Sequence, residues 1–171
     1  LSMTSKVKIM NTFNQFKNFT SNLPQSDVMP VLFMGHGSPM NGIEVNEFST
    51  GWANMAKSIP QPTAVLVVSA HWFTRGTKIT AMDFPPTIHD FGGFPDALYQ
   101  LNYPAPGAPA LAAHIVDLLQ SAGWKSRLDP HRGLDHGAWV PLLYLAPEAD
   151  IPIVQVSMPA RLDTHQAWKL G

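Results

Sequence analysis

The chain has 171 residues, of which 45% are hydrophobic and 13% are charged, and this length suits one domain with one sizeable core. Its formal net charge of -1 gives no extended field that would attract nucleic acid or anionic lipid. The absence of cysteine excludes disulfides, thiolate zinc sites, iron–sulfur clusters and thiol nucleophiles. Any metal must therefore be held by histidine, carboxylate or backbone oxygen.

The N-terminal segment is expected to carry no chemistry. Residues 1–25 contain three lysines and no acidic residue. We interpret residues 1–28 as a loosely attached arm or a remnant of cloning, and favour this over an organelle-targeting peptide because arginine is absent. With neither a secretory signal nor a run of ~18 apolar residues, the sequence predicts a cytoplasmic protein without a membrane span.

Residues 29–171 are predicted to form a single α/β domain, with a mostly parallel central sheet and helices on both faces. Three short apolar runs are typical of strands that are buried on both sides: Pro30–Met34, Ala64–Ser69 and Ile151–Met158. Two segments carry apolar residues at helical spacing: Val45–Ser58 and Ala108–Ala122. The first two strands and the helix between them predict a right-handed β-α-β unit.

The stretch from Asp83 to Pro109 is dense in proline, glycine and aromatic residues and is too long for an ordinary connection. We interpret it as an ordered functional loop. Further along the chain, Asp135 precedes the apolar segment "HGAWVPLLYL" and is expected to be a helix N-cap.

Two histidines follow predicted strands: His36 in "FMGHGSP" and His71 in "VVSAHW". Open α/β sheets bind ligands at the carboxyl ends of their strands, so these side chains can converge although they are distant in sequence. Neutral imidazole is the commonest metal ligand in proteins. The pair therefore predicts a metal site, although either histidine alone would favour a structural interpretation, as part of a turn for His36 or as a hydrogen-bonded interior residue for His71.

Two more histidines lie next to aspartates in loops, namely His89 before Asp90 and His136 after Asp135. A histidine that begins a helix beside a glycine is well placed as a general acid or base near neutral pH. The aspartates are also consistent with simple caps or turn formers. These histidines are therefore candidate site residues with a structural alternative.

Five blocks in chain order resemble the class III extradiol aromatic ring-opening dioxygenases, the LigB-like family, and are most similar to its 4,5-DOPA dioxygenase type: "PVLFMGHGSPMN", "VVSAHWFTRGT", "PPTIHDFGGFPDALYQLNYPAPG", "GLDHGAWVPL" and "DIPIVQVSM". The resemblance covers residues 29–158 and implies an α/β sandwich around a mostly parallel sheet. It also implies that a catechol such as DOPA is opened beside its two hydroxyl groups, with O₂ and one mononuclear non-haem iron(II). Zinc is associated with some bacterial relatives.

The resemblance assigns roles to three histidines. His36 and His71 correspond to two metal ligands for Fe(II) or Zn(II), and His136 corresponds to a catalytic residue that acts as acid or base or orients the substrate. A site that binds both catecholate oxygens and O₂ must leave several positions on the metal free.

The predicted substrate pocket combines a histidine, an aspartate and three aromatic residues: His89, Asp90, Trp72, Phe91 and Phe94. The first two correspond to a stretch of pocket wall in the family. The aromatic side chains are expected to exclude water and to hold the flat ring, with ordinary core packing as the alternative for each.

The resemblance further implies that family members continue through a C-terminal third, which holds the remaining metal ligands. We therefore expect this chain to be the N-terminal part of a single dioxygenase domain, with two protein ligands where a metal site needs three or more. Two alternatives remain open. One is a zinc-dependent hydrolase that uses zinc-activated water, and the other is a truncated, non-catalytic metal-binding fragment.

Overall fold

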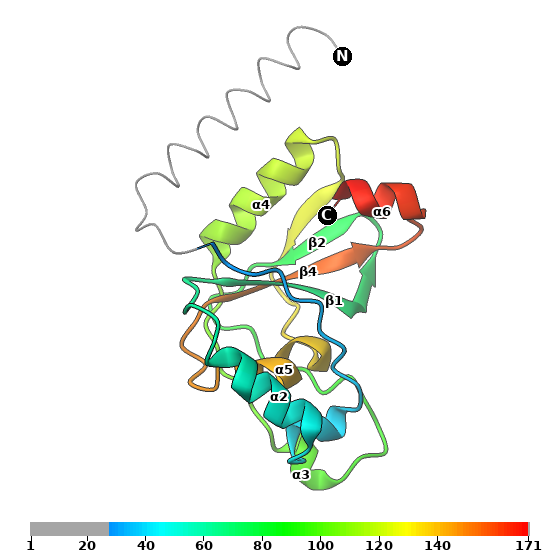
Figure 1. Cartoon of the computed structure of the whole chain (residues 1–171). Coiled ribbons are helices and arrows are strands. Elements are labelled where there is room, and N and C mark those ends of the chain that lie inside the picture. Colours follow the sequence, from blue (N-terminus) through cyan, green and yellow to red (C-terminus); the bar gives the residue numbers. More distant parts are fainter. Residues whose placement is uncertain (1–27, 171) are drawn as a thin grey trace, which may run out of the picture.

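The computed structural model describes residues 28–170, so the predicted N-terminal arm lies outside the described residues except for Val28. The described residues contain both helices and strands, which alternate one by one from α4 onward (Figure 1). In chain order the elements are η1 (Pro39–Gly42), α2 (Glu47–Ala56), β1 (Val65–Thr74), β2 (Thr77–Thr80), α3 (Asp96–Tyr99), α4 (Pro109–Ser121), β3 (Ser126–Asp129), α5 (His136–Leu145), β4 (Ile153–Pro159) and α6 (Thr164–Leu170). No helix among these residues is long and apolar enough to cross a membrane.

The four strands form one mixed sheet in the order β1-β4-β2-β3. β1 pairs with β4 and β2 pairs with β3 in parallel, whereas β2 and β4 are antiparallel. Figure 1 shows α4 on one side of the sheet and α2, α3 and α5 on the other. The expected α/β fold with a mostly parallel sheet is therefore confirmed.

The sheet separates two apolar cores because successive side chains of a strand point to opposite faces. On β4, Ile153 packs with Trp139 of α5. The next residue, Val154, packs together with Ile79 of β2 against Val116 of α4. Full burial of each aliphatic side chain contributes about 1.5–3 kcal/mol. The core that contains Trp139 thus fixes α5, the helix that carries His136, against the sheet.

The two predicted helices are confirmed, and each begins as its sequence indicates. α2 starts with a capping box, in which the backbone N–H of Ser49 donates to Asn46 Oδ1 (3.1 Å) and the backbone N–H of Asn46 donates to Ser49 Oγ (2.9 Å). α4 has Pro109 as its first residue and ends just before Gly123, whose φ of 88° favours glycine.

The predicted strand Pro30–Met34 is not formed. This stretch is irregular, and Val31 and Phe33 are fully exposed, so the predicted β-α-β unit is not formed either. β1, which was expected to pair with that strand, is an edge strand. Its residues Leu66 and Val68 point to the same face of the sheet as Val154, and they are 54% and 62% exposed. An apolar run shows that a segment can be buried, but it does not supply the strand against which to pair.

Candidate metal and active site

Three histidines from different parts of the chain meet at one place. The Nε2 atoms of His36 and His71 lie 2.8 Å apart. The ring centroid of His136 lies 5.0 Å from that of His36 and 4.1 Å from that of His71. One ligating atom of each residue can be chosen so that all three lie within 4.8 Å of one another. The structure thus brings together the expected pair and adds His136 as a third potential ligand.

An irregularity in β1 places His71. The parallel pairing of β1 with β4 shifts register between Ser69 and Phe73, which is how a bulge redirects a side chain. The backbone N–H of His71 donates to Ser69 Oγ (3.1 Å) within this bulge. A Cβ atom on Gly137 would lie 2.6 Å from His71 Cδ2 and 2.9 Å from Ser69 Oγ. Only glycine therefore fits where α5 passes the bulge.

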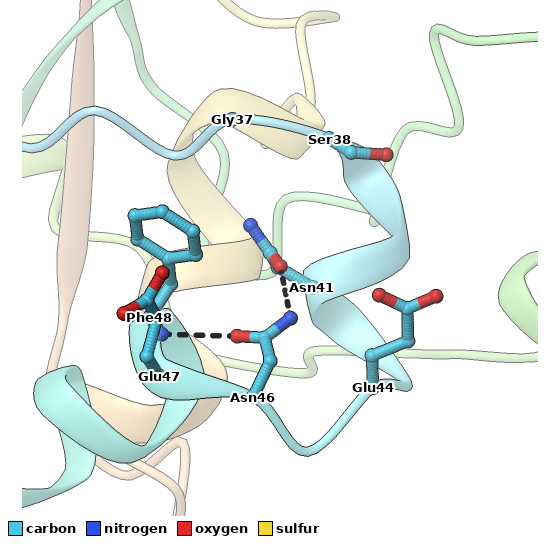
Figure 2. Close-up of a pocket in the computed structure, with 7 residues that line it drawn as sticks. All are labelled: Gly37, Ser38, Asn41, Glu44, Asn46, Glu47 and Phe48. Carbon is cyan, nitrogen blue, oxygen red and sulfur yellow. Dashed lines mark hydrogen bonds between the residues drawn. The ribbon is translucent and has the colours of Figure 1, made fainter.

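Hydrogen bonds beside a small hollow hold the loop that carries His36. The hollow is lined by residues in and around η1 and at the start of α2: Gly37, Ser38, Asn41, Glu44, Asn46, Glu47 and Phe48. Figure 2 shows the side chains of Asn41 and Asn46 directed toward each other, and Asn46 Nδ2 donates to Asn41 Oδ1 (2.7 Å). Asn41 Nδ2 in turn donates to the backbone oxygen of His36 (2.9 Å). The capping residue of α2 is thereby linked to the metal-site loop.

A carboxylate from the long loop holds His136, the first residue of α5. Asp90 Oδ1 lies 3.0 Å from the backbone nitrogen of His136 and 2.8 Å from its ring Nδ1. Burial raises the pKa of Asp90, but the hydrogen bonds and charge of His136 outweigh it and hold this pKa below its ordinary value. Asp90 is therefore an ionised acceptor at neutral pH.

Asp135 occupies the predicted N-cap position, but its side chain makes no capping hydrogen bond. It is fully buried and accepts hydrogen bonds from Ser69 Oγ (2.7 Å), Arg132 Nη2 (3.2 Å) and Gln155 Nε2. Since Ser69 also binds the backbone of His71, this carboxylate connects the bulge of β1 to the start of α5. Such a buried charge persists only when paired and hydrogen-bonded, as here.

The chemistry of the three donors fits a divalent transition metal. Burial, followed by the charges of His136 and His71, lowers the pKa of His36, so its ring is neutral and has a lone pair to donate. Three imidazole ligands are a known zinc set, and imidazole also suits iron. The site therefore has the ligand number that a catalytic metal requires, provided that His136 is counted as a ligand.

The aromatic residues of the long loop lie around His136. The ring centroid of Phe91 is 5.5 Å from that of His136, and Phe94 is 5.4 Å from Phe91. His89 lies farther back, 5.6 Å from Trp139, with its Nε2 2.9 Å from the backbone oxygen of Leu101. Among the predicted pocket residues, Asp90 bonds His136 and Phe91 packs against its ring, whereas His89 supports the loop.

Trp72, also expected in the pocket, is buried. The guanidinium carbon of Arg132 lies 5.4 Å from the centre of its ring. Arg132, which the sequence did not single out, also donates to the buried Asp135 and so joins it to Trp72. Gln155, likewise not singled out, donates to the same carboxylate. One signal for this network was available, because Gln155 is the single polar residue inside the apolar run "IPIVQV".

Comparisons with known proteins show the family of the chain. Residues 28–171 match the family model described as the catalytic LigB subunit of aromatic ring-opening dioxygenase. A protein from Escherichia coli (strain K12) named 4,5-DOPA dioxygenase extradiol is 56% identical over 144 residues, which cover 84% of this chain and 52% of that protein. A protein of the same name from Beta vulgaris is 45% identical and covers 86% of this chain and 56% of its own length.

A solved structure is also similar to this chain. The crystal structure of the uncharacterized protein JW3007 from Escherichia coli K12 is 46% identical, with a TM-score of 0.60, and the match covers 77% of this chain and 48% of that one. The chain thus spans about half the length of the relatives it matches. From the family match over residues 28–171, the chain belongs to the LigB family of aromatic ring-opening dioxygenase subunits.

Proposed function

We propose that this chain carries metal-binding residues of an extradiol dioxygenase that opens a catechol such as DOPA with O₂. The observation that carries the proposal is the convergence of three histidine donors within 4.8 Å in a chain of the LigB family. In this reaction one ring carbon–carbon bond beside the hydroxyl groups breaks and both atoms of O₂ enter the product. The catechol itself supplies the electrons that reduce O₂, so the reaction needs no other reductant.

His36 and His71 would hold the metal, Fe(II) for the dioxygenase reaction. When bound, iron(II) supplies free coordination positions through which electrons pass from a catecholate to O₂. His36 suits this role because its pKa is lowered, first by burial, so that it remains neutral. Asn41 and Ser69 hold the backbones of His36 and His71.

His136 would transfer the proton. With Nδ1 bonded to Asp90, Nε2 is the nitrogen left to accept a proton from a catechol hydroxyl and to return it later. Phe91 and Phe94 beside it would form an apolar wall for the flat ring and exclude water. In this proposal His36 and His71 are the metal ligands, and His136 is not a ligand but remains free to act on the substrate.

The test is oxygen consumption by metal-loaded protein. Protein purified without oxygen is loaded with iron(II) and mixed with L-DOPA in an oxygen electrode while the absorbance of the ring-opened product is followed. We expect one O₂ to be consumed for each catechol. Protein that binds one iron per chain but consumes no oxygen with L-DOPA or other catechols would overturn the proposal.

A zinc-dependent hydrolase is the second candidate, because three imidazole donors are also a ligand set that activates zinc-bound water. Zinc is redox-inactive, so the zinc-loaded protein should consume no oxygen in the same assay. Ester hydrolysis by the zinc form, together with an inactive iron form, would favour this second function.

A further inference from the structure

The strongest unassigned relationship in the site is the two-point contact between Asp90 and His136. One carboxylate oxygen, Oδ1, is 3.0 Å from the backbone nitrogen and 2.8 Å from the ring Nδ1 of the same residue. The backbone contact fixes the oxygen in front of the ring, because the peptide N–H can only donate. The carboxylate comes from the long loop, 46 positions before His136.

The contact determines which ring nitrogen carries the proton. An ionised carboxylate only accepts hydrogen bonds, so Nδ1 of His136 must be the donor. In a neutral imidazole the other nitrogen, Nε2, then has the free lone pair. The ring that carries this lone pair packs against His36 and His71, at centroid distances of 5.0 and 4.1 Å.

From this geometry we infer that Asp90 is a positioning residue that locks His136 in its Nδ1–H tautomer and keeps Nε2 available to the histidine cluster. The opposite tautomer would place a proton on Nε2 and block both ligation and proton acceptance. Carboxylates that orient histidines in this way commonly contribute about 10–100-fold to metal affinity or activity. The tautomer of His136 follows from the contact alone, and only the reaction in which Nε2 takes part rests on the proposed function.

The first test needs neither metal nor substrate. In metal-free protein labelled with ¹⁵N-histidine, NMR correlation of ring nitrogens with ring protons distinguishes the two tautomers of each imidazole, and the His136→Gln variant identifies the signals of His136. We expect the proton of neutral His136 on Nδ1. In Asp90→Ala the Nε2–H form should appear, whereas Asp90→Asn, whose amide oxygen can accept both bonds, should retain the Nδ1–H form.

A matched control is Asp83→Ala, which removes an exposed carboxylate from the start of the same loop and should leave the tautomer unchanged. A proton on Nε2 in the unaltered protein, or an unchanged tautomer in Asp90→Ala, would overturn the inference. Iron(II) affinity should fall about 10–100-fold in Asp90→Ala or the turnover rate should fall by the same factor, with recovery in Asp90→Asn. If no catechol is turned over while the tautomer changes as expected, the proposed function fails and the role of Asp90 stands.

Discussion

The Nε2 atoms of His36 and His71 lie 2.8 Å apart although the residues are 35 positions apart and neither lies in a regular part of the sheet. At this distance one nitrogen must donate and the other accept, so at least one ring is neutral. The fold thus holds the two imidazole rings at an interplanar angle of 57°, with Nε2 of each directed toward the other. This relationship leads to the first prediction.

Removal of either histidine should abolish tight metal binding. We expect His71→Ala to weaken iron(II) or zinc(II) binding by more than about 100-fold, since even residues that only support a ligand contribute about 10–100-fold. His165→Ala, at an exposed position of α6, is the control and should bind normally. Metal content measured after dialysis checks this, and equal content in both variants would contradict the assignment.

The role of His136 is tested by separating binding from turnover. If it acts as acid or base, His136→Ala should keep one metal per chain while kcat for catechol falls about 10²–10⁴-fold. Metal titration and oxygen uptake on the same sample provide both numbers. Loss of the metal together with activity would instead make His136 the third ligand, as its place in the histidine cluster allows.

Gly137 makes a steric prediction. A methyl group there would meet His71 Cδ2 at 2.6 Å, so Gly137→Ala should displace the ring and weaken metal binding, even though alanine favours the helix. In Gly51→Ala of α2 the added methyl group meets no atom within 4 Å, and we expect a gain of about 0.5–1 kcal/mol in stability with unchanged metal binding. Calorimetric metal titrations of both variants check the contrast. Normal metal affinity in Gly137→Ala would show that the contact is not tight.

The elements that the sequence predicted correctly are those whose signals are local. Helix α2 has its own capping box, α4 has Pro109 as its first residue, and both have apolar residues at helical spacing. Strands β1 and β4 contain apolar runs. The strands that were missed, Thr77–Thr80 and Ser126–Asp129, are short and largely polar. They form because they pair with each other and because Thr77–Thr80 also pairs with β4, and such long-range pairing leaves little trace in local sequence.

The same distinction holds for the site. The convergence of His36 and His71 was predicted from two apolar runs interpreted as parallel strands. Only the run before His71 forms a strand, so the two side chains meet although the predicted strand before His36 is absent. The bonds of Asp90 to His136 and of Ser69 to Asp135 could not be predicted, since they join residues 46 and 66 positions apart. Only the resemblance to the family linked these segments before the structure did.

Asp129 should make stability depend on pH. Burial alone would raise its pKa, but hydrogen bonds from Lys78 and from the backbones of His131 and Arg132 hold it below the ordinary value of 3.8. The folded carboxyl therefore binds its proton more weakly than the unfolded one, so its contribution is complete above this value and is lost as pH falls through the folded pKa.

Asp129→Asn should accordingly lose about 1–3 kcal/mol of unfolding free energy at pH 7, the worth of hydrogen bonds to a charged group. The difference from the unaltered protein should shrink as the pH falls below 3.8. Urea unfolding at the two ends of this range measures it. Asp117→Asn, on the exposed side of α4, should show little difference at either pH, and an equal loss at both pH values in Asp129→Asn would contradict the mechanism.

The uncovered face of β1 gives a prediction on solubility. Val68 is 62% exposed, whereas its neighbour Val67 points to the opposite face and packs against the core that contains Trp139. Val68→Thr should therefore change the unfolding free energy by no more than about 0.5 kcal/mol while it reduces self-association, because it removes apolar surface from an open sheet edge. Val67→Thr buries a hydroxyl group and should cost about 1–3 kcal/mol. Light scattering and urea unfolding of the two variants decide the matter, because equal destabilisation would mean that the side chain of Val68 is covered in solution.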